Sequence, residues 1–135
     1  MSAPAVGEAV CTAMDESYDF IVVNFANGDM VGHTGNYEAA REAVNAVDKE
    51  LGLIIEKAKE DGYAIVLTSD HGNCEEMKDS EGHILTNHTV GEVWCFVMAE
   101  GVTAVKEGCG LNNVAPTVLT LMGLEIPEEM DESLI

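Results

Sequence analysis

The sequence predicts an α/β fold with a mostly parallel sheet, built as one domain over residues 1–135. Two apolar segments of strand length, residues 18–25 and 64–68, flank a long stretch with helical periodicity. A strand, a helix and a second strand within about 50 residues form a βαβ unit, whose two strands run parallel through a right-handed crossover. The chain shows no internal repeat and no linker, so a single domain is expected.

The first predicted strand is YDFIVVNF, residues 18–25, which ends at Ala26-Asn27-Gly28. Consecutive apolar residues, several of them β-branched or aromatic, are typical of a strand that is buried on both faces, as in parallel sheets.

The helical stretch follows from residue 36 to residue 61. Apolar residues recur at three- and four-residue steps from Tyr37 to Ala58, and charged residues lie between them. Asn36 is a suitable N-cap, and Asp61-Gly62 is a suitable end. We therefore expect one long helix of about six turns.

The remaining elements are shorter. AIVLT (64–68) and VWCFVM (93–98) predict the second and third strands, separated by a polar, Gly-rich loop over residues 72–91. Residues 114–122 predict a short helix, with Pro116 in its first turn and Gly123 at its end. The acidic residues that follow predict a loop.

The charge balance excludes several partners. Six Lys and Arg against 25 Asp and Glu give a net charge of −19, which argues against binding to nucleic acid or to an anionic membrane. No apolar run approaches the ~20 residues of a membrane span, and the N-terminus lacks the basic region of a signal peptide. Four widely spaced cysteines without a C-x-x-C motif are ordinary for a cytoplasmic protein with reduced thiols.

Five imidazole and carboxylate side chains are candidate metal ligands. Asp29 and His33 follow the first predicted strand, Asp70 and His71 follow the second, and His88 belongs to the long loop. Ligands of open α/β sheets bind at the carboxyl ends of the strands, and neighbouring strands lie ~5 Å apart there. The four-residue spacing of Asp29 and His33 lets one helical turn or a tight loop aim both side chains alike.

Each of these residues taken singly has a plainer interpretation, as a turn residue or a surface histidine. Their grouping favours metal binding, whereas His83 is expected to be an exposed loop histidine. Cys74 is an alternative soft ligand, disfavoured by its oxygen and imidazole surroundings. Five ligands are too many for one structural zinc and too few for two metals. No serine lies at a Gly-flanked strand-to-helix turn, so we expect no catalytic nucleophile in this chain.

Four segments carry a resemblance to a known family: NFANGDMVGHTGNYEAAREAVNAVDKEL, TSDHGNCEEM, NHT and VAPTVLTLMGLEIPEEM. In this order they resemble the C-terminal part of the cofactor-independent (2,3-bisphosphoglycerate-independent) phosphoglycerate mutases, of the alkaline phosphatase superfamily. The resemblance runs from about residue 18 to the end. Two departures are the run Val90–Trp94, where the family usually has T-N-P-V-P, and Ser69, where it has a small Ala.

The resemblance implies part of a three-layer α/β/α, alkaline-phosphatase-like domain. The family interconverts 3-phosphoglycerate and 2-phosphoglycerate in glycolysis through a phosphoserine, with two Mn²⁺ ions, or Mg²⁺, Zn²⁺ or Co²⁺. Asp29, His33 and His88 match the ligands of one ion, and Asp70 and His71 match part of the set for the other. The family's remaining Asp ligand and nucleophilic Ser lie in its N-terminal segment, and its basic substrate-binding residues lie largely in an inserted domain.

We therefore expect a C-terminal piece that is inactive alone and that self-associates through an exposed sheet edge. Two alternatives remain open. One is another phosphotransferase of the superfamily, similar to phosphopentomutases or phosphodiesterases, and the other is a non-catalytic metal-binding or interaction module.

Overall fold

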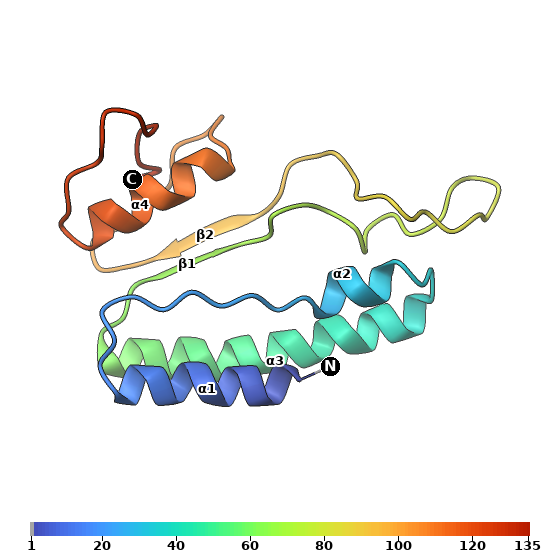
Figure 1. The fold of residues 1–135 in the computed structure, drawn as a ribbon, viewed down its shortest axis with the longest axis horizontal. Coiled ribbons are helices and arrows are strands. Elements are labelled where there is room, and N and C mark those ends of the chain that lie inside the picture. Colours follow the sequence, from blue (N-terminus) through green and yellow to red (C-terminus); the bar gives the residue numbers. More distant parts are fainter. Residues whose placement is uncertain (1) are drawn as a thin grey trace. The chain divides into compact units, whose positions relative to one another are not determined.

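The computed structural model describes residues 2–135, and its contacts group them into two compact units. The first unit contains the chain up to Asp61 together with His71–Glu92, and the second contains Gly62–Asp70 and Val93–Ile135. Figure 1 labels the helices and strands. In chain order they are α1 (Ala3–Asp15), α2 (Asn27–Gly32), α3 (Tyr37–Asp61), β1 (Ile65–Thr68), β2 (Cys95–Met98), the 3₁₀ turn η1 (Leu111–Asn113) and α4 (Val114–Leu121).

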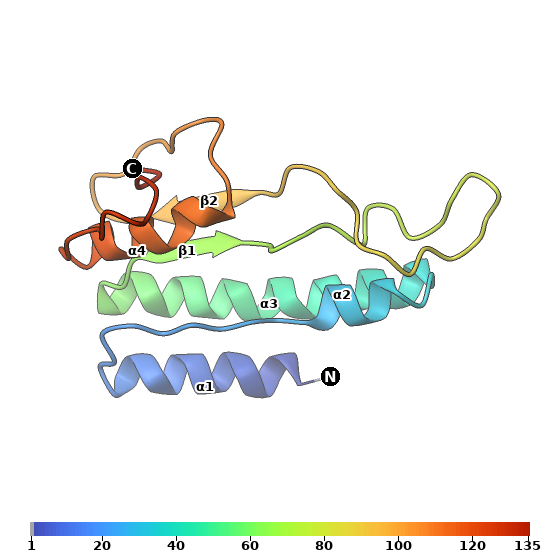
Figure 2. The same ribbon diagram turned by 45° about the horizontal axis from the view of Figure 1, so that its top comes forward.

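Helices α1 and α3 lie side by side and form the core of the first unit (Figures 1 and 2). Val10 and Met14 of α1 and Ile54 and Ala58 of α3 are buried. The Lys57 side chain of α3 fastens the two helices at one end: its Nζ lies 2.6 Å from Asp15 Oδ1 of α1 and 2.9 Å from Asp61 Oδ2 of α3. Helix α1 is not among the elements that the sequence pattern predicts.

Helix α3 confirms the long helix that periodicity predicts. The Asn36 side-chain oxygen accepts a hydrogen bond from the Ala39 N–H at 3.1 Å, as an N-cap does. The helix ends at Asp61, and the next residue, Gly62, has a φ of +79°, which a glycine adopts without strain.

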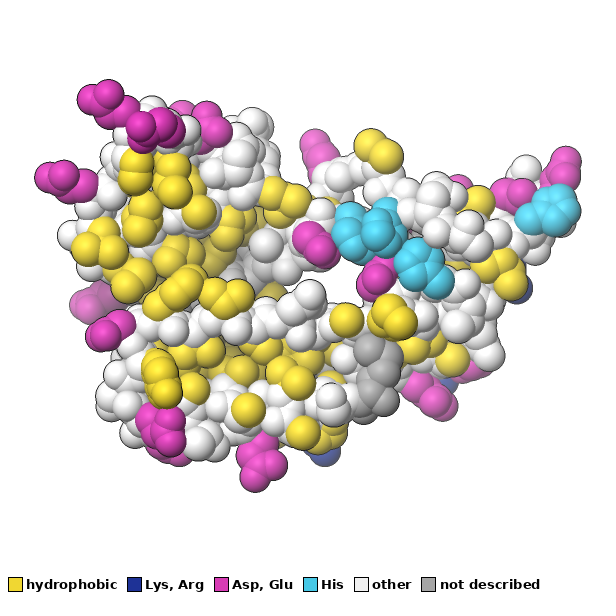
Figure 3. Space-filling model, in the orientation of Figure 1, with side chains coloured by type: hydrophobic (Ala, Val, Ile, Leu, Met, Phe, Trp, Pro, Cys, Tyr) yellow, Lys and Arg dark blue, Asp and Glu magenta, His cyan; other side chains and the backbone are white. Residues whose placement is uncertain are grey.

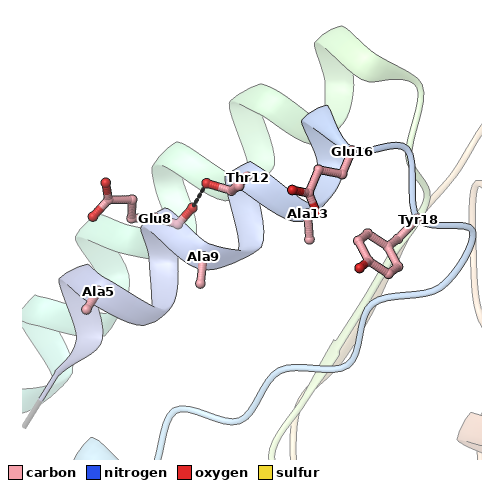
Figure 4. A pocket seen from close by; sticks show the side chains of 7 residues that line it. All are labelled: Ala5, Glu8, Ala9, Thr12, Ala13, Glu16 and Tyr18. Atoms are coloured by element: carbon pink, nitrogen blue, oxygen red, sulfur yellow. Dashed lines mark hydrogen bonds between the residues drawn. The ribbon is translucent and has the colours of Figure 1, made fainter.

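Residues 18–25 differ from expectation, because the structure assigns no strand there. The segment is extended (Figure 1), and most of its apolar side chains are exposed: Phe20 is 53% exposed and Val22 is 77% exposed. It runs beside α1, and the two enclose an open groove. Figure 4 shows a pocket along α1, where Tyr18 lies beside Ala13. Alanines fill little space along this side of α1, and Val22 and Val23 line the groove next to them.

The second unit contains a two-stranded sheet, in which β1 and β2 pair antiparallel with Ile65 opposite Met98 and Thr68 opposite Cys95. Both strands and the α/β mixture agree with the sequence prediction. The parallel crossover does not: among residues 2–135 no two strands pair in parallel. The orientation of a strand depends on its distant partner, which local apolar patterns do not report. The single domain stays a prediction.

Helix α4 and the chain end complete the second unit. The helix matches the prediction, with Pro116 in its first turn. Thr117 is fully buried; its hydroxyl donates to the Asn113 carbonyl at 2.6 Å and accepts the Leu134 N–H at 2.8 Å. The last residues, loop as expected, are thereby held against α4. No helix of the described chain is both long enough and apolar enough to cross a membrane.

Candidate metal centre

Helix α2 supplies the first two candidate ligands. It is a six-residue helix over NGDMVG, and His33 caps its C-terminal end. The spacing of four residues brings the side chains of Asp29 and His33 together, with Asp29 Oδ1 at 3.1 Å from His33 Nε2. Both side chains are about one-third exposed, so they are accessible from solvent.

The third candidate, His88, comes from the long loop. Its Nε2 lies 3.0 Å from the same Asp29 oxygen. Ligand atoms of Asp29, His33 and His88 all lie within 4.8 Å of one another. Figure 3 shows histidine side chains gathered on one face of the molecule, next to acidic side chains. The structure therefore brings together three of the five residues that the sequence singles out.

His71 lies against this group. Its ring stacks on that of His88, with ring centroids 3.5 Å apart and the planes tilted by 9°. Its Nδ1 lies 3.2 Å from the Gly72 carbonyl oxygen. A neutral imidazole that donates from Nδ1 carries its lone pair on Nε2, an arrangement common among metal-binding histidines. Asp70 belongs to the second unit, so its carboxylate is not placed relative to the other four side chains.

A buried amide, which the sequence pattern does not single out as a site residue, also contacts the group. Asn73 is 8% exposed, and its Nδ2 donates to Asp29 Oδ1 at 3.0 Å. Three nitrogens thus converge on one carboxylate oxygen: Asn73 Nδ2, His33 Nε2 and His88 Nε2. The Asn73 side chain packs directly on Gly32 of α2, where a Cβ would come within 2.8 Å of its Cγ. The close approach requires glycine at position 32. The signal for Asn73 was its place in the string DHGN.

Two of the remaining sequence expectations concern other side chains of residues 71–92, Cys74 and His83. Burial raises the pKa of the Cys74 thiol, and the charges of Glu75 and Asp29 raise it further. The thiol donates to the Gly28 carbonyl at 3.1 Å, so Cys74 anchors the loop to α2 as a protonated group. His83 is exposed, as expected, and pairs with Asp79 at 3.0 Å on the loop.

The geometry of the three ligands fits a divalent cation. Bonds of 2.0–2.2 Å from one ion to nitrogen and oxygen leave adjacent ligand atoms roughly 3–3.5 Å apart. The separations of 3.1 Å and 3.0 Å from Asp29 Oδ1 fall in this range. Two imidazoles and one carboxylate suit first-row divalent metals such as Mn²⁺, Co²⁺ or Zn²⁺, and leave coordination positions for other ligands.

Residues 1–126 match the family model of the Metalloenzyme superfamily. Among curated relatives, the chain is 71% identical over 135 residues to the 2,3-bisphosphoglycerate-independent phosphoglycerate mutase of Sulfurimonas denitrificans. It is 68% identical over 134 residues to the protein of the same name from Wolinella succinogenes. The first alignment covers all of this chain and 27% of the relative. The second covers 99% of this chain and also 27% of the relative. The chain thus spans about a quarter of the length of these relatives.

A solved structure agrees with these matches. A crystal structure of Leishmania mexicana phosphoglycerate mutase at low cobalt concentration matches 99% of this chain with a TM-score of 0.88 and 34% sequence identity. The match covers 28% of the Leishmania chain.

Proposed function

Because this chain belongs to the Metalloenzyme superfamily, we propose that Asp29, His33 and His88 bind one divalent cation. The observation that carries the proposal is the convergence of His33 Nε2 and His88 Nε2 on Asp29 Oδ1, at distances that suit one ion. We propose Mn²⁺ as the metal, with Co²⁺, Zn²⁺ or Mg²⁺ as substitutes. Asp70 and His71 form part of a second site, which needs ligands that this chain lacks.

The complete protein, in this proposal, is a 2,3-bisphosphoglycerate-independent phosphoglycerate mutase, and this chain is its C-terminal metal-binding portion. The names of the relatives and the 71% identity support it. The substrates are 3-phosphoglycerate and 2-phosphoglycerate, and the reaction belongs to glycolysis in the cytoplasm. The bound metals supply positive charge that stabilises a transferring phosphoryl group.

This chain alone is inactive in the proposal, for two reasons that its own residues give. None of its serines matches the phosphorylated Ser of the family. Its net charge of −19 repels phosphate esters, so cationic groups must come from the rest of the protein.

Calorimetric titration of the purified chain with Mn²⁺ tests the metal site. We expect one ion per chain, and strongly weakened binding in His88→Ala. The matched control is His83→Ala, which removes an exposed histidine that also pairs with an aspartate. Equal weakening by both substitutions, or two tight ions per chain, would contradict the proposal. Conversion of 3-phosphoglycerate by this chain alone would contradict the proposal that the chain is inactive without the rest of the protein.

The fold of the complete protein is part of the same proposal. Residues 18–25 become a strand of a parallel sheet in a three-layer α/β/α domain once partner strands flank them. Their composition and open apolar side chains support this. In the isolated chain the same surface promotes self-association. Light scattering at high concentration tests this expectation, and a clean monomer would contradict it.

A further inference from the structure

The carboxylate of Glu75 joins two parts of the loop that carry His71 and His88. Its Oε2 accepts the backbone N–H of Asn73 at 2.8 Å, and its Oε1 accepts the hydroxyl of Thr89. Alongside, the Thr89 N–H donates to the Gly72 carbonyl at 3.1 Å, and residues 72 and 89 form a β-bridge. The Thr89 hydroxyl and the backbone donors also hold the pKa of the Glu75 carboxyl below its ordinary value.

This junction lies next to two of the candidate ligands. Thr89 follows His88 in the chain, and Gly72 follows His71. The bridge between residues 72 and 89 therefore brings the two histidines to the same place, where their rings stack 3.5 Å apart. Space is tight there: a Cβ on Gly72 would overlap both Glu75 Oε1 and Thr89 Oγ1.

His88 needs such support because little else fixes it. Its side chain is 45% exposed, and it lies in a loop without regular secondary structure. Its contacts are the Asp29 oxygen at 3.0 Å, the stacked ring of His71 and the ring of His33 at 5.2 Å. A ligand on a mobile loop loses conformational entropy when it binds metal, and a loop that is already held loses less.

We propose that Glu75, acting through Thr89, is a positioning residue of the metal centre. It holds His88 against His71 and toward Asp29 before metal binds, and it does not itself ligate the ion. Both of its oxygens already accept hydrogen bonds, and its carboxylate is not among the atoms that converge on Asp29. The inference rests on the proposed metal site at Asp29, His33 and His88. Outer-shell partners of metal ligands typically change metal affinity by roughly 10–100-fold.

The test is Co²⁺ and Mn²⁺ titration of the full chain and its variants, by calorimetry and by the visible absorption of bound Co²⁺. Glu75→Ala and Thr89→Val should each weaken binding by roughly 10–100-fold. Each should also alter the Co²⁺ spectrum, because His88 no longer reaches the ion. Thr89→Ser keeps the hydroxyl that Thr89→Val removes, so it should bind metal as tightly as the unchanged chain. Glu76→Ala is the matched control, because it removes the same charge from the adjacent, exposed position.

A double variant adds a further check. Glu75→Ala and Thr89→Val remove the two ends of one hydrogen bond, so their combination should weaken binding little more than either alone. If the losses of binding free energy in the two single variants added up in the double variant, the proposed pairing of Glu75 with Thr89 would be overturned. Equal affinities for Glu75→Ala and Glu76→Ala, alongside tight binding by the unchanged chain, would overturn the positioning role.

A metal-free measurement separates this inference from the metal site itself. Nuclear Overhauser contacts between the His71 and His88 rings should be present in the unchanged chain and in Glu76→Ala, and absent in Glu75→Ala. If the unchanged chain binds no metal, the proposed metal site fails. The ring contacts still decide whether Glu75 positions His88, since their survival in Glu75→Ala would refute it.

Discussion

Replacing Gly32 by alanine tests the packing of Asn73 on helix α2. A Cβ at this position would overlap the Asn73 side-chain oxygen and would lie 2.8 Å from its Cγ and 3.3 Å from Cys74 Sγ. Neither neighbour can yield easily, because Asn73 is buried and bonded to Asp29 at 3.0 Å and Cys74 is bonded to the Gly28 carbonyl. The Asn73 side chain must therefore leave Asp29.

The magnitude follows from three contributions. Overpacking costs about 1–3 kcal/mol, and the lost amide hydrogen bond about 1 kcal/mol. Alanine offsets about 1 kcal/mol of this through its higher helix propensity. We expect Gly32→Ala to lower the free energy of unfolding by about 1–3 kcal/mol and to weaken Mn²⁺ binding.

Gly52→Ala is the matched control. Gly52 is also helical, but a Cβ there meets no atom within 4 Å. This variant should gain about 0.5–1 kcal/mol and bind metal unchanged. Urea unfolding followed by circular dichroism, with metal titration of the folded proteins, measures both effects. If Gly32→Ala were as stable as Gly52→Ala, the close packing of Asn73 on α2 would be refuted.

Three further predictions concern stability away from the site. Thr117→Val leaves the Leu134 N–H without its acceptor and should cost about 1–3 kcal/mol in urea unfolding, whereas Thr120→Val, at an exposed position of α4, should change little. Hydrogen bonds from Lys57 to Asp15 and Asp61 raise its pKa above the unfolded value of about 10.4. The free energy of unfolding lost in Lys57→Met should therefore be constant from about pH 7 to 10 and should shrink at higher pH. A loss that stays the same above about pH 10 would contradict the ion pairs. Asn36→Ala should cost about 1 kcal/mol through the lost helix cap, and a thermal midpoint equal to that of the unchanged chain would count against it.

Local signals predict the parts of the fold that local physics determines. Helix α3 carries its own periodicity, its cap at Asn36 and its stop at Gly62, so its ends are predicted within one residue. Helix α1 is rich in Ala, and its buried positions include Ala3 and Gly7. Small residues give little difference in hydrophobicity between the two faces of a helix, so periodicity does not predict α1.

The partners of strands are not determined locally. Residues 18–25 have the composition of a central strand, but a strand forms only with neighbours to accept and donate its hydrogen bonds. The same reasoning explains β1 and β2, whose positions follow from their apolar runs. Their antiparallel pairing follows from contacts that no single segment encodes.

In the candidate site too, some residues can be predicted from the local sequence and others cannot. Asp29, His33 and His88 are predictable, because imidazole and carboxylate groups among Gly, Asn and Thr residues are uncommon. Glu75 is one of 25 acidic residues, and nothing in its immediate sequence separates it from the others. Only the approach of Thr89, fourteen residues later, gives this carboxylate a distinct role.

The interleaving of the two units has a consequence for the order of folding. Helices α1 and α3 are close in sequence, so they can pair while later residues are still unfolded. Asp29 and His33 must wait for His88, which arrives only after the chain has left the first unit at Gly62 and returned at His71. Closing this excursion costs chain entropy that local helix contacts do not. Metal affinity should therefore appear late in refolding, after the helical signal has recovered.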